Sequence, residues 1–319
     1  MKIVVLDGYT LNPGDISWEP LAALGELTVY DRTTAEKTVE RIGDASIVLT
    51  NKTRLTAEVL SAAPAVKYVG VLATGYDVVD IAEAKRRGIP VCNVPGYATN
   101  AVAEMVFALL LEICRHAGAH SDAVRSGEWT ESPDFCFWKY PMSELHGKTM
   151  GIVGMGRTGQ KTAKIAQAFG MHVLAVSSSR PEPETEMLQY VPMDELLAQS
   201  DVISLHCPLT EETRHMVNRN SIAHMKDGVI LINIARGGLV DEKALAEALK
   251  SGKVGGAACD VVSAEPIRAD NPLLTAKNMI ITPHIAWAAR PSRERLMAQT
   301  VENVAAFLGG HPVNVVNGL

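Results

Sequence analysis

The sequence predicts an α/β protein with two doubly wound domains, each built on a parallel sheet that helices cover on both faces. Short runs rich in β-branched residues recur along the chain, and each is followed by a stretch with helical spacing of its apolar residues. Continuous apolar strands that alternate with helices are typical of parallel sheets. The runs form two separate series, and 319 residues exceed the size at which one core usually keeps growing. Both observations favour two domains.

The predicted strands follow one another in a regular order. The first series contains KIVVLD, LTVYD, SIVLT and VKYVGVLA, and the second contains TMGIVG, HVLAVS, DVISLH, VILINI, GAACDV and MIITPH. Between the two series, the apolar stretch 101–120 predicts a buried connecting helix. The stretch 121–146 has no clear period but is rich in aromatic residues, which indicates a contact between subunits. A last amphipathic helix, roughly 291–308, is expected to return to the first domain.

Composition and charge exclude several classes of protein. A net charge of −6 offers no broad basic face, so we expect no nucleic-acid partner. The start MKIVVLDGYT lacks the apolar core of a signal peptide, and no apolar stretch reaches the roughly 18 residues of a membrane span. The five cysteines are widely spaced and form no CxxC pair. They indicate reduced thiols in a cytoplasmic protein with no membrane partner.

A glycine motif lies between the first strand of the second series and the helical stretch after it. The segment GMGRTG at 154–159 matches G-x-G-x-x-G in the strand–turn–helix context that the motif requires. Gly154 permits the tight turn, Gly156 lets the backbone approach a pyrophosphate, and Gly159 brings the helix close to its strand. The alternative is an ordinary strand–turn–helix. The context favours a Rossmann dinucleotide-binding domain.

The end of the next strand indicates which dinucleotide is bound. NAD sites usually carry Asp or Glu there, which bonds the ribose 2′-hydroxyl. This chain has Ser177 instead, followed by Ser178, Ser179 and Arg180. Hydroxyl groups and a guanidinium can bind a 2′-phosphate that a carboxylate would repel. The alternative is a polar loop whose Arg180 points into solvent. We therefore expect NADP or NAD as the cofactor, with NADP favoured.

Three candidate catalytic residues each follow a predicted strand of the second series. Arg236 follows VILINIA, Glu265 follows CDVVSA and His284 follows MIITP. Ligands of open α/β sheets bind beyond the carboxyl ends of the strands. Hydride transfer to a keto acid needs a cation for the carboxylate and ketone, an acid for the alkoxide and a group that keeps this acid protonated. Each residue alone has a structural alternative, but their shared placement favours catalysis.

These motifs together resemble the D-isomer-specific 2-hydroxyacid dehydrogenase family over nearly the whole chain. The likeness within the family is greatest to glycerate dehydrogenases (hydroxypyruvate reductases), through SPDFCFWKYP and ITPHIAW. The absence of the usual acid at Ser177 departs from the family pattern and puts a preference for NAD in doubt. The matching segments are VGVLATGYDVVD, VCNVPGYATNAVAE, GIVGMGRTGQ, LHCPLTEETRHMVN, INIARGGLVDEKAL, CDVVSAEP and TPHIAWAA.

The resemblance implies roles that agree with this interpretation. His284 would be the general acid in reduction and the base in oxidation, paired with Glu265, while Arg236 would bind the substrate carboxylate and carbonyl. Backbone N–H groups around Leu72, Ala73, Thr74 and Gly75 would close the carboxylate site. From the motif and the resemblance together, the residues expected to contact the cofactor are Thr74, Gly154, Gly156, Arg157, Thr158, Gly159, Ser177, Ser178, Arg180, Cys207, Pro208, Ile234, Ala235 and Asp260.

The resemblance also implies the domain organisation. A flavodoxin-like substrate domain would comprise residues 1–99 and 287–319. A Rossmann NAD(P) domain, 100–286, would be inserted in it and would carry an arm at about 121–146 for a homodimer. A cleft that closes on the substrate is expected as well.

The expected activity is hydride transfer between NAD(P)H and a small 2-keto or 2-hydroxy acid, namely hydroxypyruvate or glyoxylate to D-glycerate or glycolate. One alternative is phosphoglycerate dehydrogenase. Its phosphorylated substrate requires additional cationic residues in the first domain, and the segment LATGYD contains none. Others are D-lactate dehydrogenase and a dinucleotide-sensing corepressor, which would need a peptide-binding groove. Lys52, at the end of SIVLTNK, is interpreted as a solvated lysine, with a contact to a polar substrate end as the alternative. His116 and His120 are interpreted as structural, since no third metal ligand is in view.

Overall fold

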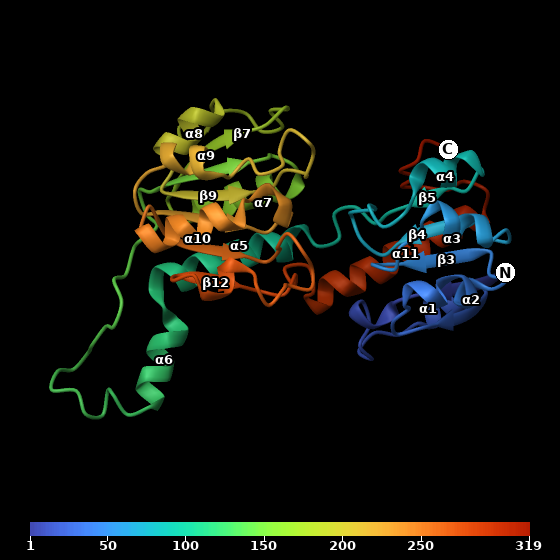
Figure 1. Ribbon diagram of the computed structural model, residues 1–319, viewed down its shortest axis with the longest axis horizontal. Helices are drawn as coiled ribbons and strands as arrows, with labels where there is room; N and C mark the ends of the chain where they lie inside the picture. Colours follow the sequence, from blue (N-terminus) through green and yellow to red (C-terminus); the bar gives the residue numbers. More distant parts are fainter. The chain divides into compact units, whose positions relative to one another are not determined.

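The computed structural model describes residues 1–319 and divides into two compact units. Unit 1 comprises Met1–Ala98 and Ala288–Leu319, and unit 2 comprises Thr99–Trp287. Each unit contains one parallel sheet with helices packed on it (Figure 1). The expectation of two doubly wound α/β domains is confirmed.

The unit 1 sheet has five parallel strands in the order β2-β1-β3-β4-β5. This is the flavodoxin-like order, in which the chain reverses direction across the sheet between β1 and β3. All four residues of β3 and of β4 are buried, as the apolar runs predicted. The two-residue β5 was not predicted, because so short a segment has no period to recognise. The strands are β1 (Lys2–Val5), β2 (Glu26–Val29), β3 (Ile47–Thr50), β4 (Tyr68–Val71) and β5 (Val91–Cys92).

Short helices cover the unit 1 sheet, and the last helix of the chain completes its core. The core includes apolar residues of β1, β3 and β4 together with Ile42, Leu60 and Ala84 from the helices. The first four of these helices are each followed by a loop that returns to the sheet. The helices are α1 (Glu19–Ala22), α2 (Thr38–Ile42), α3 (Ala57–Ala62), α4 (Ile81–Arg86) and α11 (Arg290–Leu308), with 3-10 turns at Gly8–Thr10 and Ala35–Lys37.

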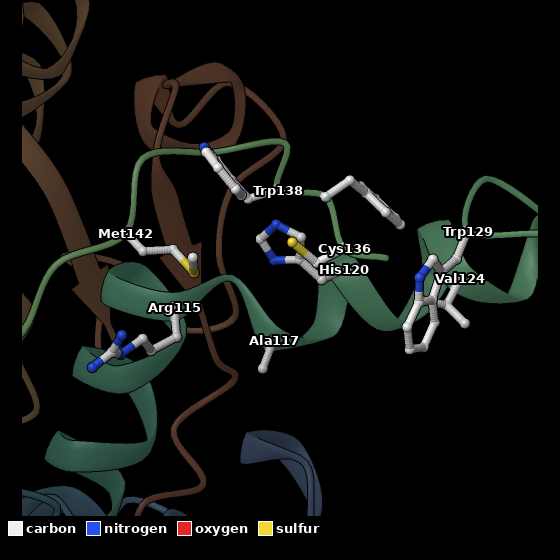
Figure 2. Close-up of a pocket in the computed structure, with 9 residues that line it drawn as sticks. Arg115, Ala117, His120, Val124, Trp129, Cys136, Trp138 and Met142 are labelled. Carbon is white, nitrogen blue, oxygen red and sulfur yellow. The ribbon is translucent and has the colours of Figure 1, made fainter. Parts of the chain in front are cut away.

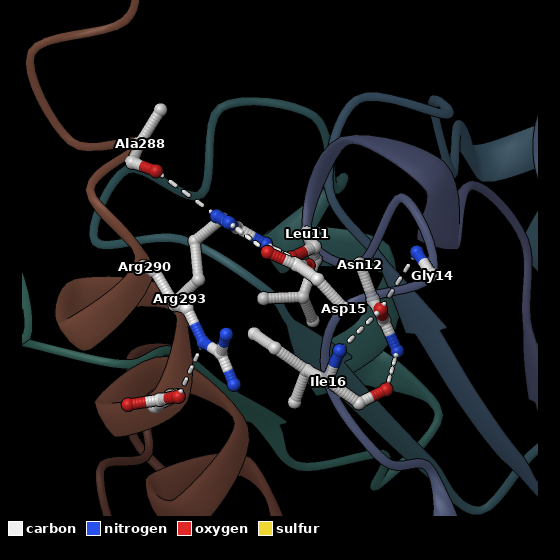
Figure 3. A network of polar contacts seen from close by, with 9 residues as sticks. Leu11, Asn12, Gly14, Asp15, Ile16, Ala288, Arg290 and Arg293 are labelled. Atoms are coloured by element: carbon white, nitrogen blue, oxygen red, sulfur yellow. Dashed lines mark hydrogen bonds and ion pairs between the residues drawn. The ribbon is translucent and has the colours of Figure 1, made fainter.

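An ion pair between a buried arginine and an exposed carboxylate ties α11 to the amino-terminal part of unit 1. The Arg293 guanidinium is bidentate to Asp15, with Nη1–Oδ1 and Nη2–Oδ2 distances of 2.7 Å, and donates further to the Leu11 carbonyl at 3.0 Å (Figure 3). The hydrogen bond from Arg293 lowers the pKa of Asp15 below its usual range. Bidentate charged pairs of this kind are directional. They explain how a helix 278 residues away in sequence is held against the segment between β1 and α1.

The unit 2 sheet has seven parallel strands in the order β12-β11-β10-β9-β6-β7-β8. This is the Rossmann order with one additional edge strand, and its switch point lies between β6 and β9. The three-residue β8 was not predicted. The strands are β6 (Thr149–Val153), β7 (His172–Val176), β8 (Leu188–Tyr190), β9 (Val202–Leu205), β10 (Val229–Asn233), β11 (Val254–Cys259) and β12 (Met279–Ile281).

Two apolar cores lie on the two faces of the unit 2 sheet. Helices α5 (Thr99–Arg115) and α7 (Arg157–Ala168) cover one face, with Leu110 and Ala166 fully buried. Helices α8 (Met193–Gln199), α9 (Arg219–His224) and α10 (Glu242–Ser251) cover the other. Two 3-10 turns, Gly237–Leu239 and Pro272–Thr275, complete the connections. Across the whole chain, no helix is both long and apolar enough to cross a membrane.

The connecting helix predicted at 101–120 is in fact two helices, so that prediction was wrong in its extent. α5 ends at Arg115 because His116 adopts the left-handed conformation, with φ of 51°, and α6 (Ala117–Arg125) then starts in a new direction (Figure 1). α6 also makes the start of the 121–146 stretch helical. Both ring nitrogens of His120 have protein partners, the His116 carbonyl and the Lys139 amide. These contacts agree with a structural role for the two histidines.

Candidate functional site

The glycine loop connects β6 to α7 at the carboxyl edge of the unit 2 sheet. Gly154 has a φ of +103°, which favours glycine. A Cβ on Gly159 would lie 2.0 Å from the Gly154 carbonyl oxygen, so only glycine allows α7 to approach the loop this closely. A Cβ on Gly156, the N-cap of α7, would meet nothing within 4 Å. Open space therefore lies before the free amides of a helix that begins with Arg157 and Thr158. This arrangement fits a pyrophosphate.

The segment 206–208 follows β9 and borders the glycine loop. A Cβ on Gly154 would lie 2.8 Å from the backbone of His206 and Cys207, and Pro208 follows directly. The His206 imidazole forms a 2.9 Å hydrogen bond with Ser204, while its Nδ1 atom is buried without a partner. Loss of solvation lowers the pKa of His206 to about 3, so the ring is neutral. Sequence reasoning missed His206, since a histidine after a strand carries no distinctive signal.

The segment that follows β7 folds back on itself. The Ser179 amide donates to the Ser177 hydroxyl at 3.3 Å, and Ser178 lies between them. Arg180 forms a 3.4 Å ion pair with Glu184 and lies over the Tyr190 ring, 5.3 Å from its centroid. Because the Arg180 side chain is 66% exposed, this ion pair is weak and leaves the guanidinium free to exchange partners. The structure thus gives Arg180 two internal contacts that the sequence did not indicate.

An imidazole–carboxylate pair lies beyond the carboxyl ends of β11 and β12. His284 Nδ1 is 2.7 Å from Glu265 Oε2, and both side chains are half-buried. Glu265 also accepts a hydrogen bond from the Val262 amide at 3.3 Å. These contacts fix the ring, and they leave Nε2 as the nitrogen that can face a substrate. The two residues are 19 apart in sequence, and the structure brings them together.

Asp260 holds the backbone that carries His284. Its buried carboxylate accepts from the Thr282 hydroxyl at 2.6 Å, the Ile285 amide at 2.9 Å and the Ala286 amide at 2.8 Å. The His284 amide donates to the Asp260 carbonyl at 2.8 Å, although His284 has a φ of 54°. Sequence reasoning assigned Asp260 to the cofactor alone. It missed this internal function, because the partners lie more than 20 residues away.

Arg236 lies beyond β10 on the same edge of the sheet. The Asn233 side chain holds its turn, donating to the Arg236 carbonyl at 2.9 Å and accepting from the Ala235 amide at 3.1 Å. The Arg236 side chain is exposed and makes one hydrogen bond, to the Ala235 carbonyl at 2.8 Å. Its remaining donors are available for a ligand. Ile234, directly before this turn, is 9% exposed.

The segment Leu72–Gly75 belongs to unit 1 and follows β4. The Leu72 amide donates to the Thr50 carbonyl at 2.8 Å and is therefore used within the sheet. The carbonyls of Ala73 and Thr74 accept from the Val94 amide (3.0 Å) and the Asn93 side chain (2.7 Å). The amides of Ala73, Thr74 and Gly75 donate no hydrogen bond within the protein. Such a segment, held by its carbonyls with its amides free, can bind an anion.

A Rossmann-type sheet, a pyrophosphate-fitting glycine loop and an imidazole–carboxylate pair on one sheet edge define a nicotinamide-dependent dehydrogenase. Comparison with known proteins agrees. Residues 107–286 match the model of the NAD-binding domain of D-isomer specific 2-hydroxyacid dehydrogenases. The chain belongs to the D-isomer specific 2-hydroxyacid dehydrogenase family. The expectations of this family and of an enzyme are confirmed.

Individual relatives match along almost the entire chain. A hydroxypyruvate reductase from Blautia hydrogenotrophica is 59% identical over 99% of this chain and 100% of its own length. An acyclic imino acid reductase solved with NADPH and D-Arg has a TM-score of 0.85 at 32% identity, covering 99% and 100% of the two chains. A D-lactate dehydrogenase from Aquifex aeolicus, solved with NAD and lactic acid, has a TM-score of 0.84 at 34% identity, covering 97% and 96%.

Proposed function

We propose that this enzyme reduces hydroxypyruvate to D-glycerate and glyoxylate to glycolate. The observation that carries the proposal is the 2.7 Å contact between His284 and Glu265 on the sheet edge that also holds Arg236 and the glycine loop. Together these residues suit the reduction of a keto group beside a carboxylate. The hydroxypyruvate reductase from Blautia hydrogenotrophica, 59% identical, supports the choice of substrate.

In this proposal the cofactor and the side chains of the site have separate roles in the reaction. The bound nicotinamide supplies a hydride to the keto carbon. His284, oriented by Glu265, donates the proton from Nε2 to the keto oxygen. The C=O double bond thus becomes a C–O single bond with a new C–H and a new O–H bond, and the ring regains a proton from solvent. Arg236 binds the carboxylate and polarises the carbonyl through donors that the protein leaves free. The free amides of Ala73, Thr74 and Gly75 add anion-binding donors.

We assign the cofactor to the glycine loop and the residues that border it, with NADP favoured over NAD. Ser177 replaces the acid that would accept the 2′-hydroxyl, and Ser178 and Arg180 offer donors to a 2′-phosphate. The weak ion pair of Arg180 with Glu184 would have to open for this contact. Arg157, Thr158, Ile234, Ala235, Asp260 and Thr74 complete the proposed set, with Cys207 and Pro208 beside it.

We further propose a homodimer formed through the arm at 121–146. The Lys139–Glu128 ion pair, 2.6 Å, and the hydrogen bond from Trp129 to the Phe135 carbonyl, 3.0 Å, hold the arm in shape. Yet Phe135 is 91% and Trp138 is 66% exposed. Aromatic side chains of the arm line a groove of about 360 Å³ against α6 (Figure 2). An ordered but uncovered aromatic surface supports a subunit contact. Five unpaired cysteines support a cytoplasmic location.

Initial rates with hydroxypyruvate, glyoxylate, pyruvate and phosphohydroxypyruvate, each with NADH and NADPH, test the proposed function. We expect the largest kcat/KM with hydroxypyruvate or glyoxylate. A preference for phosphohydroxypyruvate or pyruvate of tenfold or more would contradict the proposal and favour a phosphoglycerate or D-lactate dehydrogenase.

A further inference from the structure

The loop that carries Glu265 is held by a side chain that has no part in the reaction described above. This Glu265 loop comprises residues 260–271, directly after β11. The carboxylate of Glu242, the first residue of α10, accepts from the Ser263 amide at 2.7 Å, the Ser263 hydroxyl at 2.7 Å and the Asn271 side chain at 3.0 Å. One carboxylate therefore joins the first part of the loop to its end.

The amino terminus of α10 does not depend on Glu242. Asp241, the N-cap, accepts from the Lys243 and Ala244 amides at 3.1 Å each. The Glu242 carboxylate binds the Glu265 loop instead of its own helix. Hydrogen bonds to an ionised group are roughly twice as strong as those between neutral groups, so three of them hold the loop firmly.

The Glu265 loop also packs directly on the turn that carries Arg236. A Cβ on Gly237, the residue after Arg236, would lie 2.4 Å from the Ser263 nitrogen and still closer to the preceding carbonyl group. Only glycine lets the two backbones come this close. A short 3-10 turn then leads to Glu242, which binds Ser263 as well. The turn after β10 and the loop after β11 thus contact each other at two points.

The position of Ser263 determines where Glu265 lies. Two successive amides of the loop donate to two different carboxylates, Val262 to Glu265 at 3.3 Å and Ser263 to Glu242 at 2.7 Å. The Glu265 carboxylate in turn holds His284 Nδ1 at 2.7 Å. Contacts therefore run from Glu242 through the loop backbone to the imidazole, and a shift of the loop would move Glu265 away from the ring.

We infer that Glu242 is a positioning residue of the reduction, which keeps Glu265 against His284 and fixes this pair relative to Arg236. The inference rests on the proposed function, in which His284 donates a proton to the keto oxygen. Glu242 touches neither substrate nor cofactor and acts through Glu265. Because misplacement of a reacting group by about 1 Å can lower a rate by roughly 10²-fold, the loop that orients the acid needs rigid support.

Two replacements of Glu242 test this assignment. Glu242→Ala removes all three bonds to the loop, whereas Glu242→Gln keeps an oxygen for the Ser263 amide and loses the acceptor for Asn271. We expect kcat to fall about tenfold in the alanine variant and no more than about threefold in the glutamine variant, with KM and cofactor affinity within about threefold of wild type.

The solvent deuterium isotope effect on kcat separates positioning from a loss of folded enzyme. It should rise in Glu242→Ala, because a displaced donor makes proton transfer slower relative to the other steps. A lower kcat with an unchanged isotope effect would overturn the assignment, since the variant would then only contain fewer active molecules. The matched control is Glu247→Ala, which removes the same charge from an exposed position of α10 and should change none of these values.

A second background tests whether Glu242 acts through Glu265. In Glu265→Gln the loop no longer presents a carboxylate to His284, so the addition of Glu242→Ala should lower kcat by less than about twofold more. Equal losses in the two backgrounds would show that Glu242 acts independently and would overturn the assignment. An unchanged kcat in Glu242→Ala alone would do the same.

The choice of substrate keeps this inference separate from the proposed function. All rates are measured with the 2-keto acid that the wild type reduces fastest. If that acid is pyruvate or phosphohydroxypyruvate, the proposed substrate is wrong, and the test of Glu242 proceeds unchanged. A wild type that reduces no 2-keto acid would overturn the proposed function and the inference together.

Discussion

Three hydrogen bonds to the buried Asp260 carboxylate determine where His284 lies. The ring is then oriented by Glu265, so two acids act on one histidine in different ways. Asp260 places the backbone, and Glu265 holds Nδ1.

Replacement of His284 tests whether this residue is the general acid. We expect His284→Ala to lose at least ~10²-fold in kcat, because a positioned general acid contributes about that much. Cofactor affinity, measured by quenching of nicotinamide fluorescence, should stay the same. His224→Ala, at the end of α9, serves as the control with unchanged kcat. Turnover within a few-fold of wild type would mean that another group supplies the proton.

His206 makes stability depend on pH in a predictable direction. Its pKa in the folded protein is about 3, below the ordinary value of 6.5, so between these values the unfolded chain binds the additional proton. The free energy of unfolding should therefore fall as the pH drops from 6.5 toward 3, by up to about 1.4 kcal/mol per pH unit.

His206→Gln, which does not titrate, should remove this part of the pH dependence. The measurement is the urea midpoint of both proteins at pH 7.5 and pH 5.5. Parallel changes in wild type and variant would show that other groups cause the acid instability.

At the scale of elements, two glycines of the loop between β6 and α7 are required for different reasons. Gly159 is required for packing, since a Cβ there would meet the Gly154 carbonyl oxygen at 2.0 Å. Gly156 has open space around the position of a Cβ and an ordinary φ of −66°. Neither packing nor backbone conformation therefore requires glycine at position 156, and only a bound ligand would.

This difference predicts opposite outcomes for two similar substitutions. Gly159→Ala should destabilise the fold by roughly 1–3 kcal/mol, because backbone must move. Gly156→Ala should leave the thermal midpoint within a few degrees but weaken cofactor binding at least ~10-fold, since the methyl group occupies the space for the pyrophosphate. Calorimetry and a cofactor titration distinguish the two effects. Normal cofactor affinity in Gly156→Ala would place the dinucleotide elsewhere.

In our proposal, the loop after β7 decides the choice between the two cofactors. Ser177→Asp should shift the preference toward NADH, because a carboxylate accepts the 2′-hydroxyl and repels a 2′-phosphate. Arg180→Ala should cost roughly ten- to a hundred-fold in kcat/KM with NADPH and little with NADH. Rates of both variants with both cofactors provide the measurement. A wild type that prefers NADH tenfold would show that Arg180 keeps its contacts with Glu184 and Tyr190.

At the scale of the whole molecule, the arm is the part of the surface that a single chain does not explain. Because α6 and the following segment hold Phe135 and Trp138 in exposed positions, we expect a particle of about twice the 34.3 kDa chain mass. Trp138→Asp should shift the mass toward one chain, while its far-ultraviolet spectrum stays that of a folded protein. Light scattering after size exclusion measures this. A wild type with the mass of one chain would contradict the dimer.

The sequence by itself determined every strand of the two sheets except β5 and β8, the context of the glycine loop and the three residues proposed for catalysis. These features are local: a strand shows its apolar run, a glycine loop its spacing, and Arg236, Glu265 and His284 each follow a strand directly. The order of parallel strands then places their carboxyl ends on one edge. Local pattern and topology were therefore sufficient for the class of enzyme.

Tertiary structure alone decided how those residues are held. The end of α5 at His116, the ion pair of Arg180 with Glu184 and the three bonds to Asp260 all depend on backbone conformation or on partners outside the local pattern. The bond from the Ser263 amide to Glu242 joins residues 21 positions apart. A hydrogen bond of this kind leaves no period and no spacing in the sequence, because its partners become neighbours only when the strands pair.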